Sequence, residues 1–219
     1  MNTTTMRKTA LGIAGLAFTG GLAAAPFTTT PAHADTGKPA AKVQHDKRDS
    51  GKAKELDLKY EAQTNFYYCG PAATRNALSA SGHHINQDEA AKQLGTTEDG
   101  TNSAEDTTRV LNKVVGGNKY KTIAIPDRSA DDKQTNKLAD DIRKAVDNGR
   151  AVVANIAGTA TDTEGGTHSF QGGHYISVTG YTDNGNKVKI ADSANPNTAS
   201  YWMTTDNLAD WIATRGYSA

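Results

Sequence analysis

The most informative segment of the sequence runs from Glu61 to Arg75 and reads EAQTNFYYCGPAATR. It contains Cys69, the only cysteine of the 219-residue chain. Gly70-Pro71 follows directly, and proline is favoured in the first turn of an α-helix because its missing N–H is not needed there. We therefore predict that Cys69 stands at the start of a helix.

A helix start suits a reactive thiol better than a structural one. Free backbone amides and the helix dipole favour the thiolate form there, whereas a structural cysteine belongs on the apolar face of a helix. Gln63 lies six residues earlier, and its amide can join the backbone N–H of Cys69 in stabilising the oxyanion of acyl transfer. The stretch thus predicts a nucleophile, Cys69, and an oxyanion donor, Gln63.

A thiol nucleophile needs a base, and the chain offers six histidines. Only His174 begins a segment with strand patterning, HYISVTGYT, so that a sheet would hold its ring in place. We place His168 in a polar, glycine-rich loop over residues 159–173, where its geometry would be poorly fixed. The others fall in N-terminal segments or a predicted loop: His33, His45, His83 and His84. The sequence therefore predicts His174 as the base.

The group that orients the base depends on the register of a hairpin. The segments HYISVTGYT and KVKIADS flank a turn at Asp183–Asn186, which is a β-hairpin signal. If the turn carries a left-handed bulge, the numbers of paired residues sum to about 368, and Asp192 shares a face with His174 one diagonal step away. A two-residue turn would give a sum of about 369 and place Asp192 on the opposite face.

The order Gln63, Cys69, His174 and Asp192, with the phrases YYCGPAA, GGHYISVTGY and KIADSA, resembles a known family. It is similar to the bacteriocin-processing-like (double-glycine-peptidase-like) cysteine peptidases of the papain-like superfamily, over about residues 56–219. The resemblance implies a papain-like fold in which the nucleophile helix packs against an antiparallel sheet carrying the base. It also implies Cys69 as nucleophile, His174 as base, Asp192 as orienter and Gln63 as oxyanion donor.

The chain departs from that family in two respects. The family usually has Asp-Pro after the last strand, whereas here Ser193 follows Asp192, which leaves Asn195 as a second candidate for the orienter. No transporter domain accompanies the peptidase segment in these 219 residues. We therefore expect the enzyme to meet its substrates outside the cell.

The patterns along the chain predict an α+β domain. Caps and helical spacing predict helices near residues 70–81, 87–94, 104–115, 138–148 and 206–213. Strand patterns lie near residues 120–125, 151–158, 174–182, 187–193 and 201–203. Helices come first and a mainly antiparallel sheet comes last.

The first 34 residues have the organisation of a secretory signal peptide. A short basic region, Arg7-Lys8, precedes an uncharged apolar stretch over residues 10–25, and Ala32-His33-Ala34 supplies the small-residue cleavage pattern. Residues 35–55 follow with six cations, four anions and no aromatic side chain. Such a segment cannot bury enough apolar surface to offset its ordering entropy. We predict a disordered spacer or short propeptide there, and a folded domain over residues 56–219.

The composition argues against several classes of function. The formal net charge is zero, so no basic surplus is left to neutralise nucleic-acid phosphates. No apolar run after the signal approaches the length of a membrane span. The sequence has no EF-hand or P-loop, and His83-His84 lacks the spacing of a zinc ligand pair. We expect no cofactor, no metal ion, and a secreted monomer acting on a peptide or protein.

Two functions of different classes remain open. One is a secreted cysteine peptidase that hydrolyses peptide bonds through a triad and an acyl-enzyme; a peptidoglycan peptidase or acyl transferase is an alternative on the same fold. The other is a catalytically silent module that binds peptides or cell-wall material. NlpC-type cell-wall enzymes usually carry Asp-Cys-Ser-Gly, whereas this chain has Tyr-Cys-Gly-Pro around Cys69. That difference favours peptide hydrolysis.

Overall fold

The computed structural model describes residues 53–219. The predicted signal peptide and nearly all of the predicted spacer lie outside the described residues. The α-helices of the described part are α1 (Cys69–Ala80), α2 (Gln87–Leu94), α3 (Ala104–Val115), α4 (Asp132–Asp147) and α5 (Thr205–Ile212). Its strands are β1 (Lys54–Glu55), β2 (Thr122–Ile125), β3 (Val152–Thr161), β4 (Thr167–Thr182), β5 (Lys187–Ala191), β6 (Ser200–Thr204) and β7 (Arg215–Ser218).

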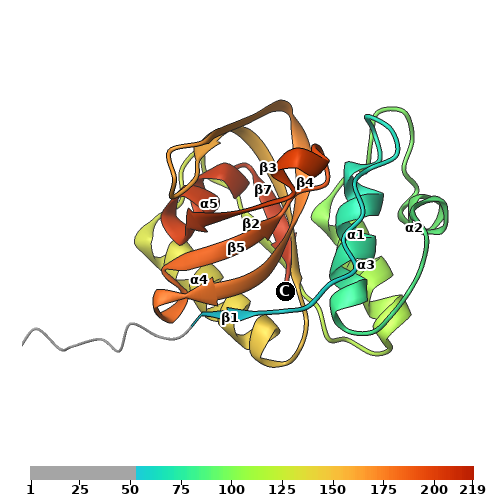
Figure 1. Ribbon diagram of the computed structural model, residues 1–219, viewed down its shortest axis with the longest axis horizontal. Helices are drawn as coiled ribbons and strands as arrows, with labels where there is room; N and C mark the ends of the chain where they lie inside the picture. The colour runs from blue at the N-terminus through green and yellow to red at the C-terminus, as the bar shows by residue number, and fades with distance from the viewer. Residues whose placement is uncertain (1–52) are drawn as a thin grey trace, which may run out of the picture. The chain divides into compact units, whose positions relative to one another are not determined.

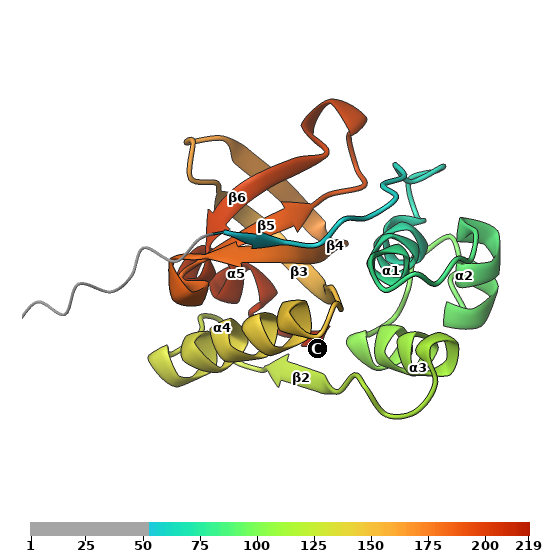
Figure 2. The same ribbon diagram turned by 60° about the horizontal axis from the view of Figure 1, so that its bottom comes forward.

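These strands form one antiparallel sheet in the order β2-β7-β3-β4-β5-β6, with β1 paired to β4. Figure 1 shows α1, α2 and α3 gathered to one side of the sheet, and Figure 2 shows α4 and α5 on its other side. The predicted α+β class, with helices first and the sheet last, is confirmed. Among residues 53–219, no helix is long and apolar enough to cross a membrane.

The first half of the central strand β3, residues 152–156, is buried on both faces. Val152, Ala154 and Ile156 pack in the core that α4 and α5 cover, whereas Val153 packs in a second core with Leu78 of α1. A strand covered on both sides needs apolar residues at successive positions. This explains the nearly continuous apolar run of β3.

The first turn of helix α1 is closely packed against its neighbours. Ala72 and Ala73 are buried, and the hydroxyl of Ser177 in β4 donates to the carbonyl oxygen of Ala73 at 2.8 Å. A Cβ on Gly70 would lie 2.2 Å from Oγ1 of Thr101, so only glycine fits there without a shift. The start of α1 is therefore fixed between β4 and the segment that contains Thr101.

The structure corrects the loop that we predicted over residues 159–173. Strand β3 continues to Thr161 and β4 begins at Thr167, so only residues 162–166 turn between them. The carboxylate of Asp162 closes this turn by accepting two backbone N–H groups. Both strands are partly exposed here, and their polar side chains gave the sequence the character of a loop.

A short strand, β1, precedes residue 56, where we predicted that the folded domain begins. Lys54 and Glu55, the last residues of the predicted spacer, pair with Tyr181 and Gly180 of β4. Backbone hydrogen bonds hold this short strand, and they require no apolar side chains. Composition therefore gave no sign of it.

Two details at the C-terminus also differ from the prediction. Helix α5 begins at Thr205, one residue early, because the hydroxyl of Thr204 accepts the N–H of Asn207 and caps it. Strand β7 was not predicted at all, although it lies between β2 and β3. It has only four residues, too few for a clear alternation, and follows Thr214 at φ 65°.

Candidate active site

Three of the predicted site residues meet where α1 begins. Nε2 of His174 lies 2.8 Å from Oδ1 of Asp192, and the Cys69 thiol is near enough to the same ring to raise its pKa. Strand β4 carries the histidine, α1 begins at the cysteine, and the aspartate directly follows β5. The imidazole thus lies between a thiol and a carboxylate, as nucleophilic catalysis by a thiol requires.

The contact between His174 and Asp192 depends on a β-bulge. Next to the hairpin turn the numbers of paired residues sum to 369, the register that we expected to turn Asp192 away. A bulge between Val178 and Gly180 shifts the pairing by one residue, and beyond it the sum is 368. The preferred turn register was wrong, but the predicted face of Asp192 is right because the bulge compensates.

Asp192 is held by several donors. Its side chain is 5% exposed; Oδ1 also accepts the backbone N–H of Ala194, and Oδ2 accepts the hydroxyl of Tyr201, each at 2.9 Å. The other candidate, Asn195, is exposed and its side chain caps the following turn. The structure brings Asp192, and not Asn195, to the histidine ring.

Burial and hydrogen bonding act in opposite directions on the protonation of the pair. Burial would lower the pKa of His174, but hydrogen bonds to Asp192 and Cys69 and the charges of both outweigh it and raise that pKa from 6.5 to about 9. Burial would raise the pKa of Asp192, but the hydrogen bond and charge of His174 lower it below its usual value. An imidazolium beside a carboxylate is therefore favoured at neutral pH.

Aromatic packing further fixes the ring. Phe170 stacks on His174 with ring centroids 4.0 Å apart and an interplanar angle of 17°. Neither Phe170 nor Tyr201 was predicted from the sequence as a support of the site. Phe170 precedes His174 by four residues on one strand, and this spacing places two residues on one face, so recognising the strand earlier would have indicated the contact.

His168 lies in strand β4 and is held by two contacts, contrary to the prediction of a poorly fixed loop residue. Its Nε2 lies 2.9 Å from Oδ2 of Asp162, and its ring stacks on Tyr201 with centroids 3.7 Å apart. Tyr201 in turn donates to Asp192. His168 therefore supports the Asp192 carboxylate indirectly, through Tyr201.

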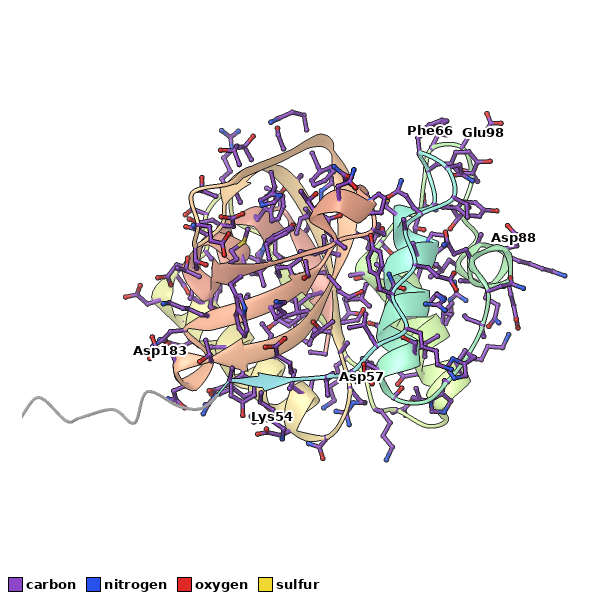
Figure 3. The ribbon with its side chains drawn as sticks, in the orientation of Figure 1. Lys54, Asp57, Phe66, Asp88, Glu98 and Asp183 are labelled. Carbon is purple, nitrogen blue, oxygen red and sulfur yellow. The ribbon has the colours of Figure 1, made fainter. Side chains whose placement is uncertain are left out.

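Gln63 joins the segment before α1 to the segment after β5. Its Nε2 donates to the carbonyl oxygen of Asn65 at 2.8 Å, and its Oε1 accepts the hydroxyl of Ser193 at 3.3 Å. One of its two amide N–H groups is thus engaged. Close by, Phe66 projects from the tip of this segment and is 81% exposed (Figure 3).

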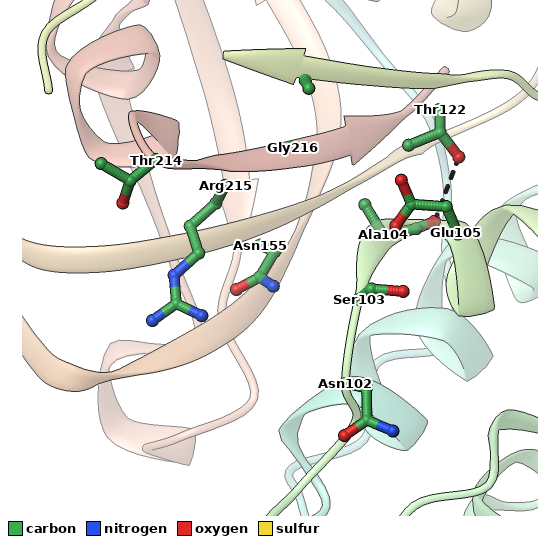
Figure 4. A pocket seen from close by; sticks show the side chains of 10 residues that line it. Asn102, Ser103, Ala104, Glu105, Thr122, Asn155, Thr214, Arg215 and Gly216 are labelled. Atoms are coloured by element: carbon green, nitrogen blue, oxygen red, sulfur yellow. Dashed lines mark hydrogen bonds between the residues drawn. The ribbon is translucent and has the colours of Figure 1, made fainter. Parts of the chain in front are cut away.

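A cleft of about 170 Å³ opens beside Cys69 and His174. One wall is the segment before α3, with Asp99, Gly100, Thr101 and Asn102; the sheet contributes Asn155, Gly172, Gly173, Tyr175 and Arg215. Gln63 does not line this cleft. An adjoining pocket of about 250 Å³ shares Asn102, Asn155 and Arg215 with it (Figure 4). Within residues 53–219, no group of three or more His, Cys, Asp or Glu side chains is placed to hold a metal ion.

A cysteine at a helix start beside an imidazole from an antiparallel sheet is the architecture of papain-like cysteine peptidases. The family model of the Peptidase_C39 like family matches residues 55–219, and the chain belongs to this family. It is thus a cysteine peptidase by family. The resemblance inferred from the motifs is confirmed.

Three solved structures are similar to the chain. A C39-like peptidase from Bacillus anthracis matches with a TM-score of 0.50 and 12% identity, covering 75% of this chain and 96% of that chain. The peptidase domain of Streptococcus ComA, a bifunctional ABC transporter involved in a quorum-sensing pathway, has a TM-score of 0.49 and 16% identity, with coverage of 75% and 96%. A double glycine motif protease from an AMS/PCAT transporter, solved with its leader peptide, has a TM-score of 0.46 and 11% identity, with coverage of 75% and 91%. No curated protein matches the chain significantly.

Proposed function

We propose that this chain is a secreted cysteine peptidase that hydrolyses peptide bonds through a Cys69–His174–Asp192 triad and an acyl-enzyme intermediate. One observation carries the proposal: the His174 ring hydrogen-bonds a buried carboxylate and lies in the same cleft as the only thiol of the chain, whose charge raises its pKa. A silent binding module has no need of this arrangement. A thiol, an imidazole and a carboxylate arranged in this way favour catalytic turnover over binding alone.

The proposed reaction uses the two ring nitrogens differently. Because Asp192 engages Nε2, Nδ1 of His174 is the nitrogen that takes the proton of the Cys69 thiol. The sulfur then attacks the peptide carbonyl carbon, and the imidazolium returns its proton to the leaving amine as the C–N bond breaks. Water next attacks the thioester while His174 accepts its proton, and release of the acid restores the thiol.

We propose the backbone N–H of Cys69 and the amide of Gln63 as donors to the oxyanion. The first N–H groups of a helix have no partner within it, and Cys69 is the first residue of α1. Gln63 keeps one amide N–H beyond the one that it donates to Asn65. Both donors would act where negative charge develops.

Covalent labelling followed by a peptide digest tests this function. An epoxysuccinyl inhibitor should modify Cys69, detected as a mass increase on the peptide that contains it. A mass-spectrometric digest of a peptide library should then show cleavage that the same inhibitor abolishes. An unlabelled thiol and an uncleaved library would favour the silent binding module instead.

Asp192→Asn should reduce kcat/KM by roughly 10- to 100-fold, the loss expected for one charge-assisted hydrogen bond. The amide oxygen can still accept the ring N–H, but the charge that raises the pKa of His174 is lost. The wild-type ring holds its proton below about pH 9 and loses it above, so activity should fall as the pH rises through 9. In the variant this fall should occur at lower pH.

Asn195→Ala is the matched control, because Asn195 is exposed and does not contact the ring. Its pH profile of kcat/KM should coincide with that of the wild type. If Asn195→Ala shifts the profile and Asp192→Asn does not, the orienter has been assigned to the wrong residue.

We further propose that residues 1–34 direct export and that the mature enzyme acts as a monomer outside the cell. Their basic start, apolar stretch and Ala32-His33-Ala34 pattern support this. The protein recovered from the culture medium should begin at Asp35 when its N-terminus is sequenced. Retention in the cell with Met1 intact would contradict it.

A further inference from the structure

Arg215, the first residue of β7, lies where the cleft beside Cys69 meets the neighbouring pocket. It lines both cavities, together with Asn155 and Asn102. A Cβ built on Gly173 would lie 3.3 Å from Nη2 of Arg215, so the guanidinium packs against the residue that precedes His174. A cation therefore borders the space where a peptide must lie to reach the thiol.

The guanidinium has no acceptor within the described part of the chain. Arg75, Arg109 and Arg143 each pair with a carboxylate, but the side chain of Arg215 makes no hydrogen bond or ion pair with any of residues 53–219. Arg215 is only half-buried, yet it has five N–H donors. An unpaired group of this kind beside an active-site thiol is suited to a ligand.

The neighbouring carboxylates do not neutralise it. Asp99 lines the cleft and Glu105 lines the pocket, but within residues 53–219 neither forms an ion pair with Arg215. In Figure 4, Glu105 lies near Thr122, and the guanidinium of Arg215 extends toward the other side of the pocket. A substrate group can therefore reach Arg215 without displacing a protein carboxylate.

Hydrogen bonds hold the residues around Arg215 in place. Asn155 donates to the hydroxyl of Tyr175 at 3.0 Å, and that hydroxyl donates to the carbonyl oxygen of Thr101 at 3.2 Å. Arg215 itself pairs with Ile125 in the sheet, which fixes its backbone. A site whose walls and backbone are already fixed loses little entropy when a ligand binds.

We propose that Arg215 binds a carboxylate of the peptide substrate and thereby selects acidic peptides. A planar guanidinium donates two parallel hydrogen bonds to a carboxylate, a geometry that a neutral amide matches poorly. The carboxylate can belong to an Asp or Glu side chain or to the free C-terminus of the peptide. The inference rests on the proposed function, since it concerns the substrate of the same site.

The size of the cleft limits where the carboxylate lies along the substrate. The cleft has a volume of only about 170 Å³, and an extended peptide rises about 3.3 Å per residue. Cys69 and Arg215 line this one cleft. The acidic group should therefore lie within about two residues of the cleaved bond.

The test begins with the full wild-type enzyme and the peptide library. Among cleaved peptides, Asp and Glu should be enriched at one position within two residues of the cleavage site, or the free C-terminus should lie there. Two fluorogenic peptides made from the best-cleaved sequence, with Glu or Gln at that position, should differ in kcat/KM by about tenfold or more. Free-acid and amidated peptides identify which carboxylate is bound.

In Arg215→Gln, the ratio of kcat/KM for the Glu-containing peptide to kcat/KM for the Gln-containing peptide should be close to one. Arg215→Glu should instead favour a peptide with Lys at the same position. Arg109→Gln is the matched control, because it removes an exposed cation that is already paired with Asp106, and it should leave the ratio unchanged. If Arg215→Gln does not fold, Arg215→Lys keeps the charge without the two parallel hydrogen bonds and should lower the ratio.

The outcomes separate this inference from the proposed function. Efficient cleavage with neither acidic enrichment nor a free C-terminus at that position, or a preference for the carboxylate that persists in Arg215→Gln, overturns the inference and leaves the peptidase assignment intact. If the wild type cleaves no peptide and Cys69 is not labelled, the proposed function is contradicted, and the inference is lost with it.

Discussion

Cys69→Ala is expected to abolish peptide hydrolysis while the protein stays folded. The chain has no second cysteine to replace the nucleophile, and loss of the nucleophile in a triad enzyme lowers kcat on the order of a million-fold. Cys69 lies half-buried at the first position of α1, where alanine is readily accommodated. The free energy of unfolding should therefore change by less than about 1 kcal/mol.

Two measurements check this expectation. Kinetics with a peptide from the library digest should give no detectable turnover for Cys69→Ala, and chemical denaturation should give a transition close to that of the wild type. Cys69→Ser, which keeps a hydroxyl of similar size, serves as the matched variant and should also be inactive. Turnover of more than about one per cent of the wild-type rate in Cys69→Ala would mean that another group is the nucleophile.

His174→Ala should reduce turnover almost as far, because the thiol and the imidazole act as one unit. The losses should not add, so the double variant should be no slower than Cys69→Ala alone. The side chain of His174 is 4% exposed, and its removal leaves the buried Asp192 carboxylate without its partner. We expect the free energy of unfolding to fall by about 3 kcal/mol.

His84→Ala is the suitable control for the base, because His84 is exposed and follows the end of α1. It should leave both turnover and unfolding unchanged. His168→Ala should lower stability, because its ring stacks on Tyr201, which holds Asp192. If His168→Ala abolished turnover and His174→Ala spared it, the base would be His168.

Features set by neighbouring residues could be predicted from the sequence. Helix α2 is an example: the side chain of Asn86 accepts the N–H of Glu89 and begins it, and Gly95 at φ 72° ends it. The place of Cys69 at the first position of α1 follows in the same way from Gly70-Pro71. Caps and first-turn prolines act within a few residues, and the sequence shows them directly.

The hairpin register could not be predicted, because it depends on a distant segment. Asp183 and Asn184 adopt positive φ values, which gives the turn a register that would carry Asp192 away from His174. The compensating bulge ends at Gly180, where a Cβ would lie 2.7 Å from the carbonyl oxygen of Lys54. No local signal near residue 180 reveals this approach of β1.

The position of Arg215 was missed for a similar reason. Strand β7 is short, and its position is fixed by pairing with β2 and β3. No pattern in the sequence therefore indicates that Arg215 lies near Cys69. The misjudged environment of His168 has a different cause. Polar side chains on a half-exposed hairpin resemble those of a loop, and only the pairing of β3 with β4 distinguishes the two.

The pH dependence of alkylation tests the central claim most directly, namely that His174 activates the Cys69 thiol. Haloacetamide modification of the wild type should remain fast well below pH 8.5, where a free thiol is largely protonated. In His174→Ala the rate at low pH should drop toward that of an ordinary thiol. A wild-type rate that rises only with ordinary thiol ionisation, and that His174→Ala leaves unchanged, would contradict the claim.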